Sequence, residues 1–468
     1  MGTISDKLMR IINTKEDIRQ ALISKGYDVP TSIPFKEYAK MISDLPCRVD
    51  SFPDIEGIVA RYSALGLTNE QMAANPVWVD KTGNGHDLQM KNFAWKEGSG
   101  ISDIYPGALV FDGVDDWAGC DNLPLLPKEK GYSIIALRNW ITRYDATQYK
   151  RPLISNLDTN DEGAFLIEYR KDENVNDVTG SYNSFTDVYI DDNNPITWQT
   201  SSSYNGQIIK KGTSKSTNKL CICKTYFGQL SNYANAAIWE IVILDHDATE
   251  EELTKIKDYF IKTYPWLFPD QAWTVTGKTN EDEDRATIAN ITGNGNDLVL
   301  SNFGFVEGSG YNEEGEYAGY LVTDGVDDRV QDSSFKLNKD WTLVGEWVFL
   351  NQKATNAGIT KPFSFVVYNR TTGLSLFINT GTSGITIENV KSIKAICSDG
   401  RIYLDYWSEM LISKDQDITS STSVLSIGFN GTAYTQIAFK NLGIYNNQIL
   451  SKDDCIKAYN YLQTLKAK

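Results

Sequence analysis

The chain has 468 residues and a formal net charge of −16, from 45 Lys and Arg against 61 Asp and Glu. This acidity disfavours a surface that binds the phosphates of nucleic acid or of an anionic membrane. The chain also lacks an apolar stretch long enough to cross a bilayer, so we expect no membrane insertion.

The first 46 residues differ from the rest because their apolar positions recur at helical spacing. They predict three short amphipathic helices, separated by Gly26, Pro30 and Pro34. The apolar faces of these helices carry Ile4, Leu8, Ile11, Ile18, Leu22, Phe35, Tyr38 and Ile42. Helices this short bury little area alone, so we expect residues 1–50 to anchor the chain to a partner or to oligomerise. A small cap packed on the following domain is the alternative.

Two motifs occur twice in the same order. Residues 82–88 (TGNGHDL) return at 292–298 (TGNGNDL), an offset of 292 − 82 = 210 positions. Residues 111–116 (FDGVDD) return at 323–328 (TDGVDD), an offset of 323 − 111 = 212 positions. This period is far longer than the roughly 20–50 residues of solenoid repeats. The chain is therefore a duplicated domain, with copies predicted at 51–265 and 266–468.

Each copy contains runs rich in Tyr, Trp, Val and Ile between turn residues, for example at 132–137 and 341–347. Many such strands in one domain predict two packed sheets. The fold class is therefore mainly β, with two tandem β-sandwiches behind a small helical segment. Each copy closes with a strand and a helix, and the helices begin at capping boxes that start at Thr249 and Ser451. The prolines at 265–270 predict a linker.

The order of these motifs is similar to that of a known fold family. Residues 80–88, then 111–116, then the closing strand and helix resemble the laminin-G-like, concanavalin A-type jelly rolls. The resemblance covers 51–265 well and 271–468 less well, since Asn290 replaces Asp80. It implies the sandwich fold. The function stays open, because this fold hosts lectins, adhesion modules, hydrolases and inert spacers.

Two acidic clusters recur in the copies. They consist of Asp112, Asp115 and Asp116, and of Asp324, Asp327 and Asp328. One interpretation is a Ca²⁺ site, because hard cations prefer carboxylate oxygens. The other is a turn, in which glycine supplies a positive φ and Asp side chains bind backbone amides. The spacing lacks the alternating ligands of a dedicated calcium loop, so we favour the turn and expect no cofactor.

The residues offer little for catalysis. His86 and His246 are the two histidines of the chain, and Asn296 and Gln448 stand opposite them in the second copy. The six cysteines form no metal-binding pattern and predict free thiols in a protein assembled in a reducing cytoplasm. Glu240 and Asp245 fall on opposite faces of a strand, and Glu168 and Asp172 are roughly 13 Å apart, too far for an acid pair. We expect no enzyme activity.

Aromatic residues are the remaining candidates for ligand contact. Trp78, Trp95 and Trp117 cluster around the turns of the first copy, and exposed rings can stack on sugar faces. Phe305 stands opposite Trp95, which favours a core role for that position. Arg329 stands opposite Trp117, so Trp117 is the better candidate for an exposed glycan contact.

The leader carries a second resemblance. Residues 3–8, 14–18, Gly26 and 35–39 resemble the start of tail and fibre proteins of bacteriophages and prophages of gut Bacteroidetes, including crAss-like phages. The resemblance implies a virion surface protein, a head or tail fibre or a capsid decoration subunit, assembled in the bacterial cytoplasm. Its partners would be other virion proteins, further copies of itself in a homo-oligomer such as a trimer, and a host-surface glycan. The alternatives are a purely structural spacer or cement protein and, third, a glycan hydrolase.

Overall fold

The computed structural model describes residues 52–126, 131–142, 150–158, 217–225, 232–335, 337–350, 392–411 and 436–467. It also describes short strand segments and single residues between these ranges. The contacts along the chain divide it into Met1–Pro53 and Asp54–Lys468. The predicted helical faces of the leader, with Ile4, Leu8, Ile11, Ile18, Leu22, Phe35, Tyr38 and Ile42, lie outside the described residues.

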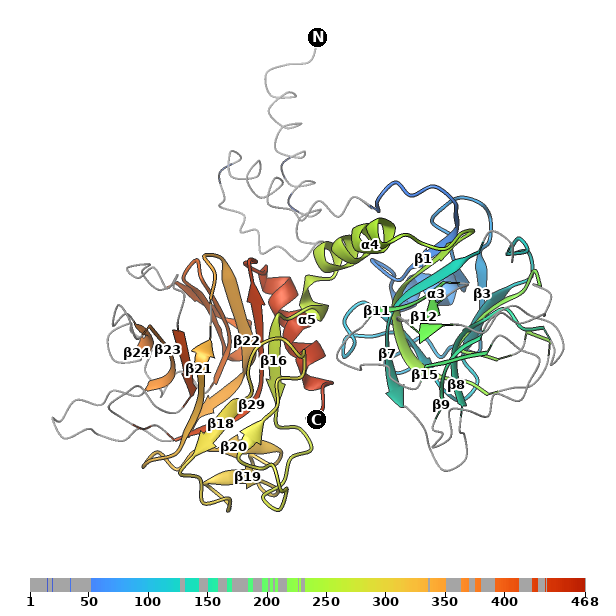
Figure 1. Cartoon of the computed structure of the whole chain (residues 1–468). Helices are drawn as coiled ribbons and strands as arrows, with labels where there is room; N and C mark the ends of the chain where they lie inside the picture. The colour runs from blue at the N-terminus through green and yellow to red at the C-terminus, as the bar shows by residue number, and fades with distance from the viewer. Residues whose placement is uncertain are drawn as a thin grey trace, which may run out of the picture. The chain divides into compact units, whose positions relative to one another are not determined.

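The first sandwich consists of two sheets (Figure 1). Its eight-stranded sheet has the order β13-β12-β11-β7-β15-β5-β4, and β1 also pairs with β15. These strands are β1 (Ile58–Ser63), β4 (Gly100–Ile101), β5 (Leu109–Asp112), β7 (Ser133–Thr142), β11 (Ile196–Thr200), β12 (Ser203–Tyr204), β13 (Gln207–Ile208) and β15 (Asn235–Leu244). Its seven-stranded sheet has the order β10-β9-β8-β14-β6-β3-β2. These strands are β2 (Val77–Trp78), β3 (Leu88–Lys91), β6 (Trp117–Cys120), β8 (Lys150–Ser155), β9 (Leu166–Arg170), β10 (Ser184–Asp187) and β14 (Leu220–Ile222).

The second sandwich is built in the same way. Its eight-stranded sheet has the path β19-β20-β29-β22-β25-β26-β27, with β16 on β29. These strands are β16 (Gln271–Thr274), β19 (Gly310–Asn312), β20 (Tyr320–Val322), β22 (Trp341–Phe349), β25 (Ser392–Cys397), β26 (Arg401–Leu404), β27 (Glu409–Leu411) and β29 (Ile437–Asn446). The six-stranded sheet has the order β17-β18-β21-β28-β23-β24. These strands are β17 (Thr287–Ile288), β18 (Leu298–Ser301), β21 (Arg329–Phe335), β23 (Phe363–Asn369), β24 (Ser375–Asn379) and β28 (Ser423–Ile427).

The two sandwiches share one topology. In the first, the last strand, β15, pairs with β7 on one side and with β5 and β1 on the other. In the second, the last strand, β29, pairs with β22 on one side and with β20 and β16 on the other. The predicted mainly β fold of β-sandwiches is therefore confirmed, and the shared topology agrees with a duplication.

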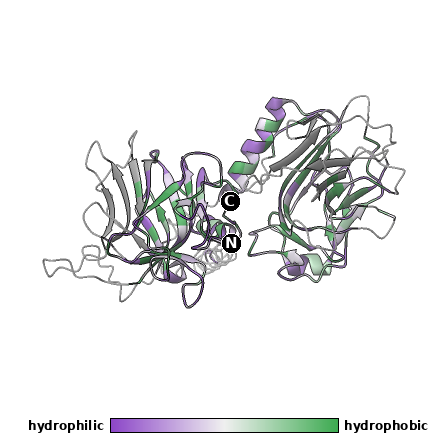
Figure 2. Ribbon diagram, turned by 60° about the horizontal axis from the view of Figure 1, so that its bottom comes forward, coloured by the Kyte–Doolittle hydropathy of each residue, from purple (hydrophilic) through white to green (hydrophobic). Residues whose placement is uncertain are grey.

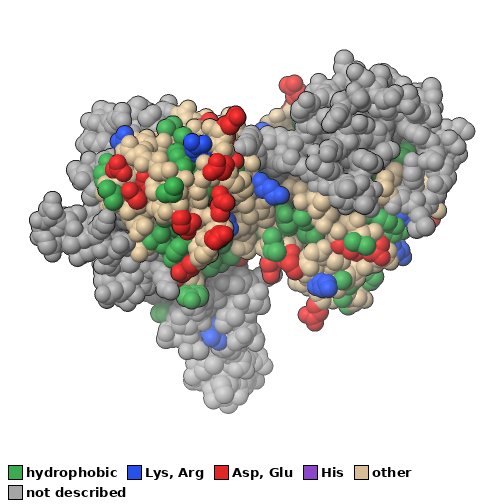
Figure 3. Space-filling model, turned by 90° about the horizontal axis from the view of Figure 1, so that it is seen from below, with side chains coloured by type: hydrophobic (Ala, Val, Ile, Leu, Met, Phe, Trp, Pro, Cys, Tyr) green, Lys and Arg blue, Asp and Glu red, His purple; other side chains and the backbone are tan. Residues whose placement is uncertain are grey.

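The core of each sandwich lies between its sheets. Strand β3 shows the pattern: Leu88 and Met90 are buried in the core, whereas Gln89 and Lys91 are exposed. Figure 2 shows hydrophobic residues concentrated in the strands and hydrophilic residues in many of the connecting turns. The acidic composition is visible in Figure 3 as Asp and Glu side chains spread over this view of the described surface.

The repeated glycine motif forms a turn that leads into a strand. The Asp80 side chain accepts hydrogen bonds from the N–H groups of Arg61, at 3.1 Å, and Thr82, at 3.0 Å. In the second sandwich the amide oxygen of Asn290 accepts from the N–H of Thr292 at 3.1 Å. An amide oxygen therefore replaces a carboxylate oxygen without loss of the turn.

A helix follows the last strand of each sandwich: α4 (Glu250–Thr263) and α5 (Lys452–Gln463). The capping box at Thr249 is confirmed, since Thr249 and Glu252 bond reciprocally. At α5 the Ser451 side chain accepts from the N–H of Asp454. A short helix, α3 (Asn69–Ala74), lies between β1 and β2. None of the described helices has the length and apolar character that a membrane span requires.

The predicted linker at 265–270 is a packed segment. It contains the 3-10 helix η1 (Pro265–Leu267), in which Trp266 and Leu267 are buried. Tyr445 of β29 donates a hydrogen bond from its hydroxyl to the Trp266 carbonyl oxygen at 2.9 Å. The connection is therefore attached to the second sandwich. The cysteines within the described residues, which exclude Cys47, are free and buried, as predicted.

Candidate functional site

Strand β6 presents an aromatic side chain on the outer face of the seven-stranded sheet. Ala118 and Cys120 belong to the core. Because side chains alternate along a strand, Trp117 and Gly119 lie on the opposite face. Strand β6 is an inner strand, flanked by β14 and β3. The partly exposed Trp117 side chain therefore lies on the broad face of the sheet.

Two neighbours hold the Trp117 ring in place. The ring of Phe227 meets it edge-on, with centroids 5.6 Å apart and planes at 89°. The Lys224 ammonium lies 4.1 Å from the centroid of the Trp117 ring and donates a hydrogen bond to the Phe227 carbonyl oxygen at 3.3 Å. Burial lowers the pKa of Lys224. A ring that is already ordered loses little side-chain entropy when it binds a ligand.

Gly119 makes room for the aromatic pair. A Cβ at this position would lie 2.8 Å from Cζ3 of Trp117 and 3.2 Å from Cε2 of Phe227. It would also lie 2.6 Å from the carbonyl oxygen of Leu220 in β14. Both rings therefore extend over the backbone of β6 at a point where a larger residue would displace them.

Polar side chains border the rings on the adjacent strand. In β3, Lys91 pairs with Trp117, and Gln89 pairs with Gly119. Both β3 side chains are exposed on the same outer face. They place an ammonium and an amide, both hydrogen-bond donors, beside the aromatic pair. We call Trp117, Phe227, Gln89 and Lys91 the Trp117 surface.

The second sandwich carries different residues at the equivalent place. In its six-stranded sheet Ser301 pairs with Arg329, and Val299 pairs with Gln331. Arg329 therefore takes the place of Trp117, and Gln331 that of Gly119. Val299, which is 53% exposed, replaces Gln89. The same scaffold thus presents an aromatic pair in one copy and an aliphatic and polar surface in the other.

The other predicted tryptophans have structural roles. Trp78 is 1% exposed and donates from its ring N–H to the carbonyl oxygen of Ser63 at 2.9 Å. The prediction that Trp78 contacts a glycan is therefore wrong, because β2 turns its ring into the core. Trp95 is partly exposed and stacks on Phe93, with centroids 4.9 Å apart, against that core. It has φ 54°, and Phe305 in the second sandwich has φ 51° in the same turn.

The sequence does not predict that Phe227 and Lys224 contact Trp117. They lie 227 − 117 = 110 and 224 − 117 = 107 positions from Trp117. They reach it because β14, which immediately precedes them, pairs with β6. No local pattern in the sequence signals such a contact. The one available signal was the difference between the copies at Trp117 and Arg329.

The acidic clusters form equivalent turns in the two sandwiches. Asp112 Oδ1 accepts from the N–H groups of Val114, at 2.8 Å, and Asp115, at 3.2 Å. Asp116 Oδ2 accepts from the N–H of Asp112 at 3.1 Å. The same bonds recur in the second copy at Asp324, Val326, Asp327 and Asp328.

In each cluster one carboxylate oxygen per residue lies within 4.8 Å of the others. Calcium takes roughly six to eight oxygen ligands, whereas two of the three carboxylates here already bind backbone amides. The geometry therefore fits the turn better than a Ca²⁺ site.

The Glu240 carboxylate, one of those considered for hydrolysis, lies beneath α4. It is 0% exposed and accepts hydrogen bonds from Arg61 Nε at 2.6 Å and from the Tyr264 hydroxyl at 2.7 Å. Arg61 also donates to the Tyr259 hydroxyl at 3.0 Å. Burial raises the pKa of Tyr264 well above its usual value. This network joins α4 to β1 and β15 and gives Glu240 no access to a glycan. Glu168 and Asp172 lie outside the described side chains.

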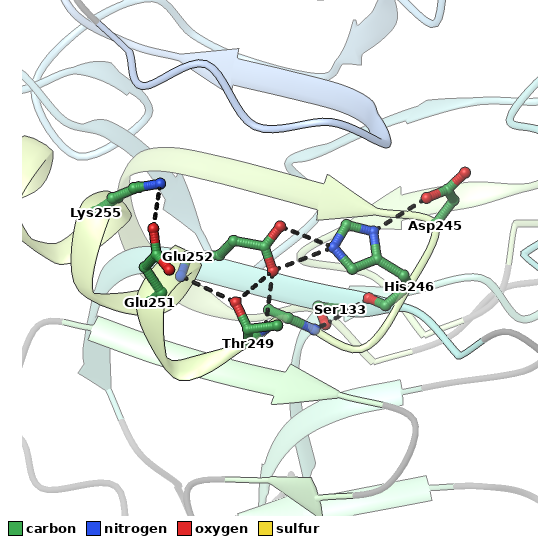
Figure 4. Close-up of polar contacts among 8 residues, drawn as sticks. Ser133, Asp245, His246, Thr249, Glu251, Glu252 and Lys255 are labelled. Atoms are coloured by element: carbon green, nitrogen blue, oxygen red, sulfur yellow. Dashed lines mark hydrogen bonds and ion pairs between the residues drawn. The ribbon is translucent and has the colours of Figure 1, made fainter.

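His246 forms a clasp at the start of α4 (Figure 4). Its Nδ1 lies 3.2 Å from Asp245 Oδ1, and its Nε2 lies 3.1 Å from Glu252 Oε1. Partial burial lowers the pKa of His246, but the bonds to Asp245 and Glu252 outweigh it and leave the pKa above its usual value. Ser133 Oγ donates to the His246 carbonyl oxygen at 2.8 Å and accepts from the N–H of Ala248 at 2.7 Å.

The second sandwich keeps the backbone part of this clasp. Thr342 Oγ1 donates to the Gln448 carbonyl oxygen at 3.1 Å and accepts from the N–H of Leu450 at 2.9 Å. A hydroxyl therefore fixes the turn before the helix in both copies, and the histidine is an addition of the first. The histidine contacts the carboxylates of Asp245 and Glu252 at the start of α4. Its role is therefore structural.

No protein-family model matches the chain, and no curated protein matches it. Solved structures that are similar include a Trypanosoma rangeli sialidase in complex with sialic acid. It is 11% identical, with a TM-score of 0.28, over 57% of this chain and 48% of that one. The chain thus spans about half the length of that sialidase.

The ligand-binding domain of botulinum neurotoxin serotype D, in complex with N-acetylneuraminic acid, is 10% identical. Its TM-score is 0.33, over 84% of this chain and 96% of that one. The binding domain of botulinum neurotoxin serotype D/C is 12% identical, with a TM-score of 0.33, over 82% and 99%.

Proposed function

We propose that this chain is a bacteriophage virion surface protein whose first sandwich contacts a host-surface glycan through the Trp117 surface. The observation that carries the proposal is the aromatic pair of Trp117 and Phe227, which lies over Gly119 on the outer face of a sheet. Exposed rings bind the apolar faces of sugars, and neighbouring donors bind their hydroxyl groups. Gln89 and Lys91 supply such donors at the edge of the rings.

The contrast between the copies supports this assignment. A ring needed for packing alone would be expected in both sandwiches, as the Trp95 and Phe305 pair illustrates. Trp117 instead gives way to Arg329, in a strand with the same pairing. The aromatic surface is therefore a property of the first sandwich that the shared fold does not require.

The virion assignment rests on the leader. Its predicted apolar faces need a partner, and its sequence resembles the start of phage tail and fibre proteins. Tandem sandwiches of a laminin-G-like type behind such a leader suit a head or tail fibre or a decoration subunit. A single stacked sugar is bound weakly, and display of the chain in a homo-oligomer would raise the overall avidity. The proposal includes no enzyme activity.

The test uses the full-length chain on a glycan array and on intact host cells. We expect a set of glycans whose binding Trp117→Ala abolishes and Trp117→Phe largely keeps, because Phe retains a ring over Gly119. Arg329→Ala, at the equivalent place in the second sandwich, is the matched control and should bind normally. A wild-type binding pattern for Trp117→Ala, with no glycan lost, would refute the Trp117 surface.

Two further results would replace the proposal. If the chain binds no glycan and no cell but still joins virus particles through residues 1–50, a structural spacer or cement protein is the better account. Release of free sugar from the arrayed glycans would indicate a hydrolase.

A further inference from the structure

We propose a second saccharide-binding point, at the tip of a hairpin in the second sandwich. The strands β26 and β27 pair antiparallel, with Arg401 opposite Leu411 and Tyr403 opposite Glu409. Between them lies the turn η2 (Asp405–Trp407) with Ser408, closed by a hydrogen bond from the Ser408 N–H to the Asp405 carbonyl oxygen at 3.2 Å. We call Tyr406 and Trp407 the 406–407 tip.

The backbone of this tip is unfavourable for the residues that it carries. Tyr406 has φ 55° and ψ 23°, and Trp407 has φ 59°. Two consecutive positive φ values define the hairpin turn that Asn-Gly adopts most readily. Bulky aromatic residues are strained in this left-handed region. The chain therefore holds two large rings in a conformation that other residues adopt at lower cost.

Asn and Gly are the usual residues of such a turn, because they adopt positive φ at low cost. Strain that bulky residues keep in this region is characteristic of functional positions.

The two rings of the tip have different environments. Trp407 packs edge-on against Tyr459 of α5, with centroids 5.6 Å apart and planes at 82°, and also contacts Tyr403, at 6.1 Å. Lys394 lies 4.4 Å from the Tyr459 ring and supports this cluster. Tyr406, by contrast, is 100% exposed. Trp407 therefore fixes the turn, and the turn holds the Tyr406 ring out into solvent.

The surroundings of Tyr406 identify a neutral saccharide as the ligand class. One exposed ring matches the apolar face of a single sugar. It is too small to form a stable protein interface, which covers roughly 800 Å² on each partner. Asp405 is partly exposed, and Ser408 and Glu409 are exposed, so oxygen acceptors for sugar hydroxyl groups are near. These carboxylates and the net charge of −16 disfavour a sugar that carries an acidic group.

The 406–407 tip is separate from the Trp117 surface. It lies in the eight-stranded sheet of the second sandwich, whereas the Trp117 surface lies on the seven-stranded sheet of the first. If both exist, the two copies of one fold bind sugars by non-equivalent surfaces. The proposal does not depend on where the chain is displayed, and it survives if the Trp117 surface binds nothing.

The test is an array of neutral and acidic oligosaccharides, probed with the full-length chain and three variants. Tyr406→Asn removes the ring and places a residue that tolerates positive φ, so the fold should remain intact. We expect it to bind the neutral oligosaccharides roughly three- to tenfold more weakly. Tyr406→Phe, which keeps the ring, should bind as the wild-type chain does. Trp117→Ala should leave this neutral binding in place.

Two results would overturn the proposal. The first is equal binding of neutral oligosaccharides by Tyr406→Asn and the wild-type chain. The second is the absence of all neutral binding once Trp117 is replaced, because every sugar contact would then belong to the Trp117 surface. A thermal unfolding curve for Tyr406→Asn at or above that of the wild-type chain confirms that the loss is one of binding.

Discussion

Replacement of Asp116 by Asn should stabilise the protein near neutral pH and leave its stability unchanged in acid. Asp116 is 0% exposed, and its Oδ1 has no hydrogen-bond partner among the described residues. Burial is the main cause that raises the pKa of its carboxyl group from 3.8 to about 6; a side-chain hydrogen bond with Ser99 lowers this pKa, and the charge of Asp112 raises it. The turn therefore has to accommodate a poorly solvated charge at neutral pH.

The magnitude follows from this pKa. The folded state holds the proton of Asp116 more tightly than the unfolded chain does. The stability that this proton contributes is fully present below pH 3.8 and is lost as the pH rises through about 6. A difference of about 2 pKa units corresponds to up to about 3 kcal/mol. Asn keeps an oxygen that can accept from the N–H of Asp112 but carries no charge. At about pH 7 the variant should be more stable by up to that amount.

The assay is urea unfolding of the full-length chain, followed by tryptophan fluorescence from about pH 3.5 to 8. The quantity of interest is the difference between variant and wild type, because other carboxylates titrate in both. Asp328→Asn should behave alike in the second sandwich, where burial raises the pKa of Asp328 to about 6. The exposed Glu56→Gln should show no such difference. A variant that is less stable at every pH would refute the burial argument and show that the carboxylate is needed as an acceptor.

Two further predictions concern the attachment of α4. Glu240→Gln should destabilise the first sandwich by about 3–5 kcal/mol in urea unfolding, because it leaves the buried charge of Arg61 uncompensated; a loss below about 1 kcal/mol would contradict this. His246 contributes stability below its ordinary pKa of 6.5 that is lost as the pH rises through its raised folded-state pKa. Glu252, whose pKa the Thr249 and His246 contacts lower against the effect of burial, contributes above 4.5. Amide exchange at the start of α4 should therefore be slowest between these values. His246→Gln, which introduces the residue of the second sandwich, should remove the loss of protection at higher pH and leave the acid limb, because the Thr249 contacts of Glu252 remain; an unchanged alkaline limb would exclude the clasp.

The local features of this fold could be predicted from the sequence because they depend on residues close together in the chain. The repeated motifs identified the duplication, and the strand orders of the two sandwiches agree with it. Glycine at 113, with φ 77°, and Asp112 specify the acidic turn by themselves. The start of α4 follows from Thr249 and its partner three residues later. Each of these needs contacts only within a few positions.

Apart from the difference between the copies at Trp117 and Arg329, tertiary structure decided which rings reach solvent. Trp78 and Trp117 both lie in short strands among similar turns, yet one is buried and the other partly exposed. The difference comes from strand pairing over long distances in sequence, which brings Phe227 to Trp117. The sequence does not predict the 406–407 tip either. Tyr and Trp are common in strands, and only the positive φ angles of Tyr406 and Trp407 show that they form a turn. Side-chain periodicity assigns a face to each residue, but only the packing of the sheets determines which face is covered.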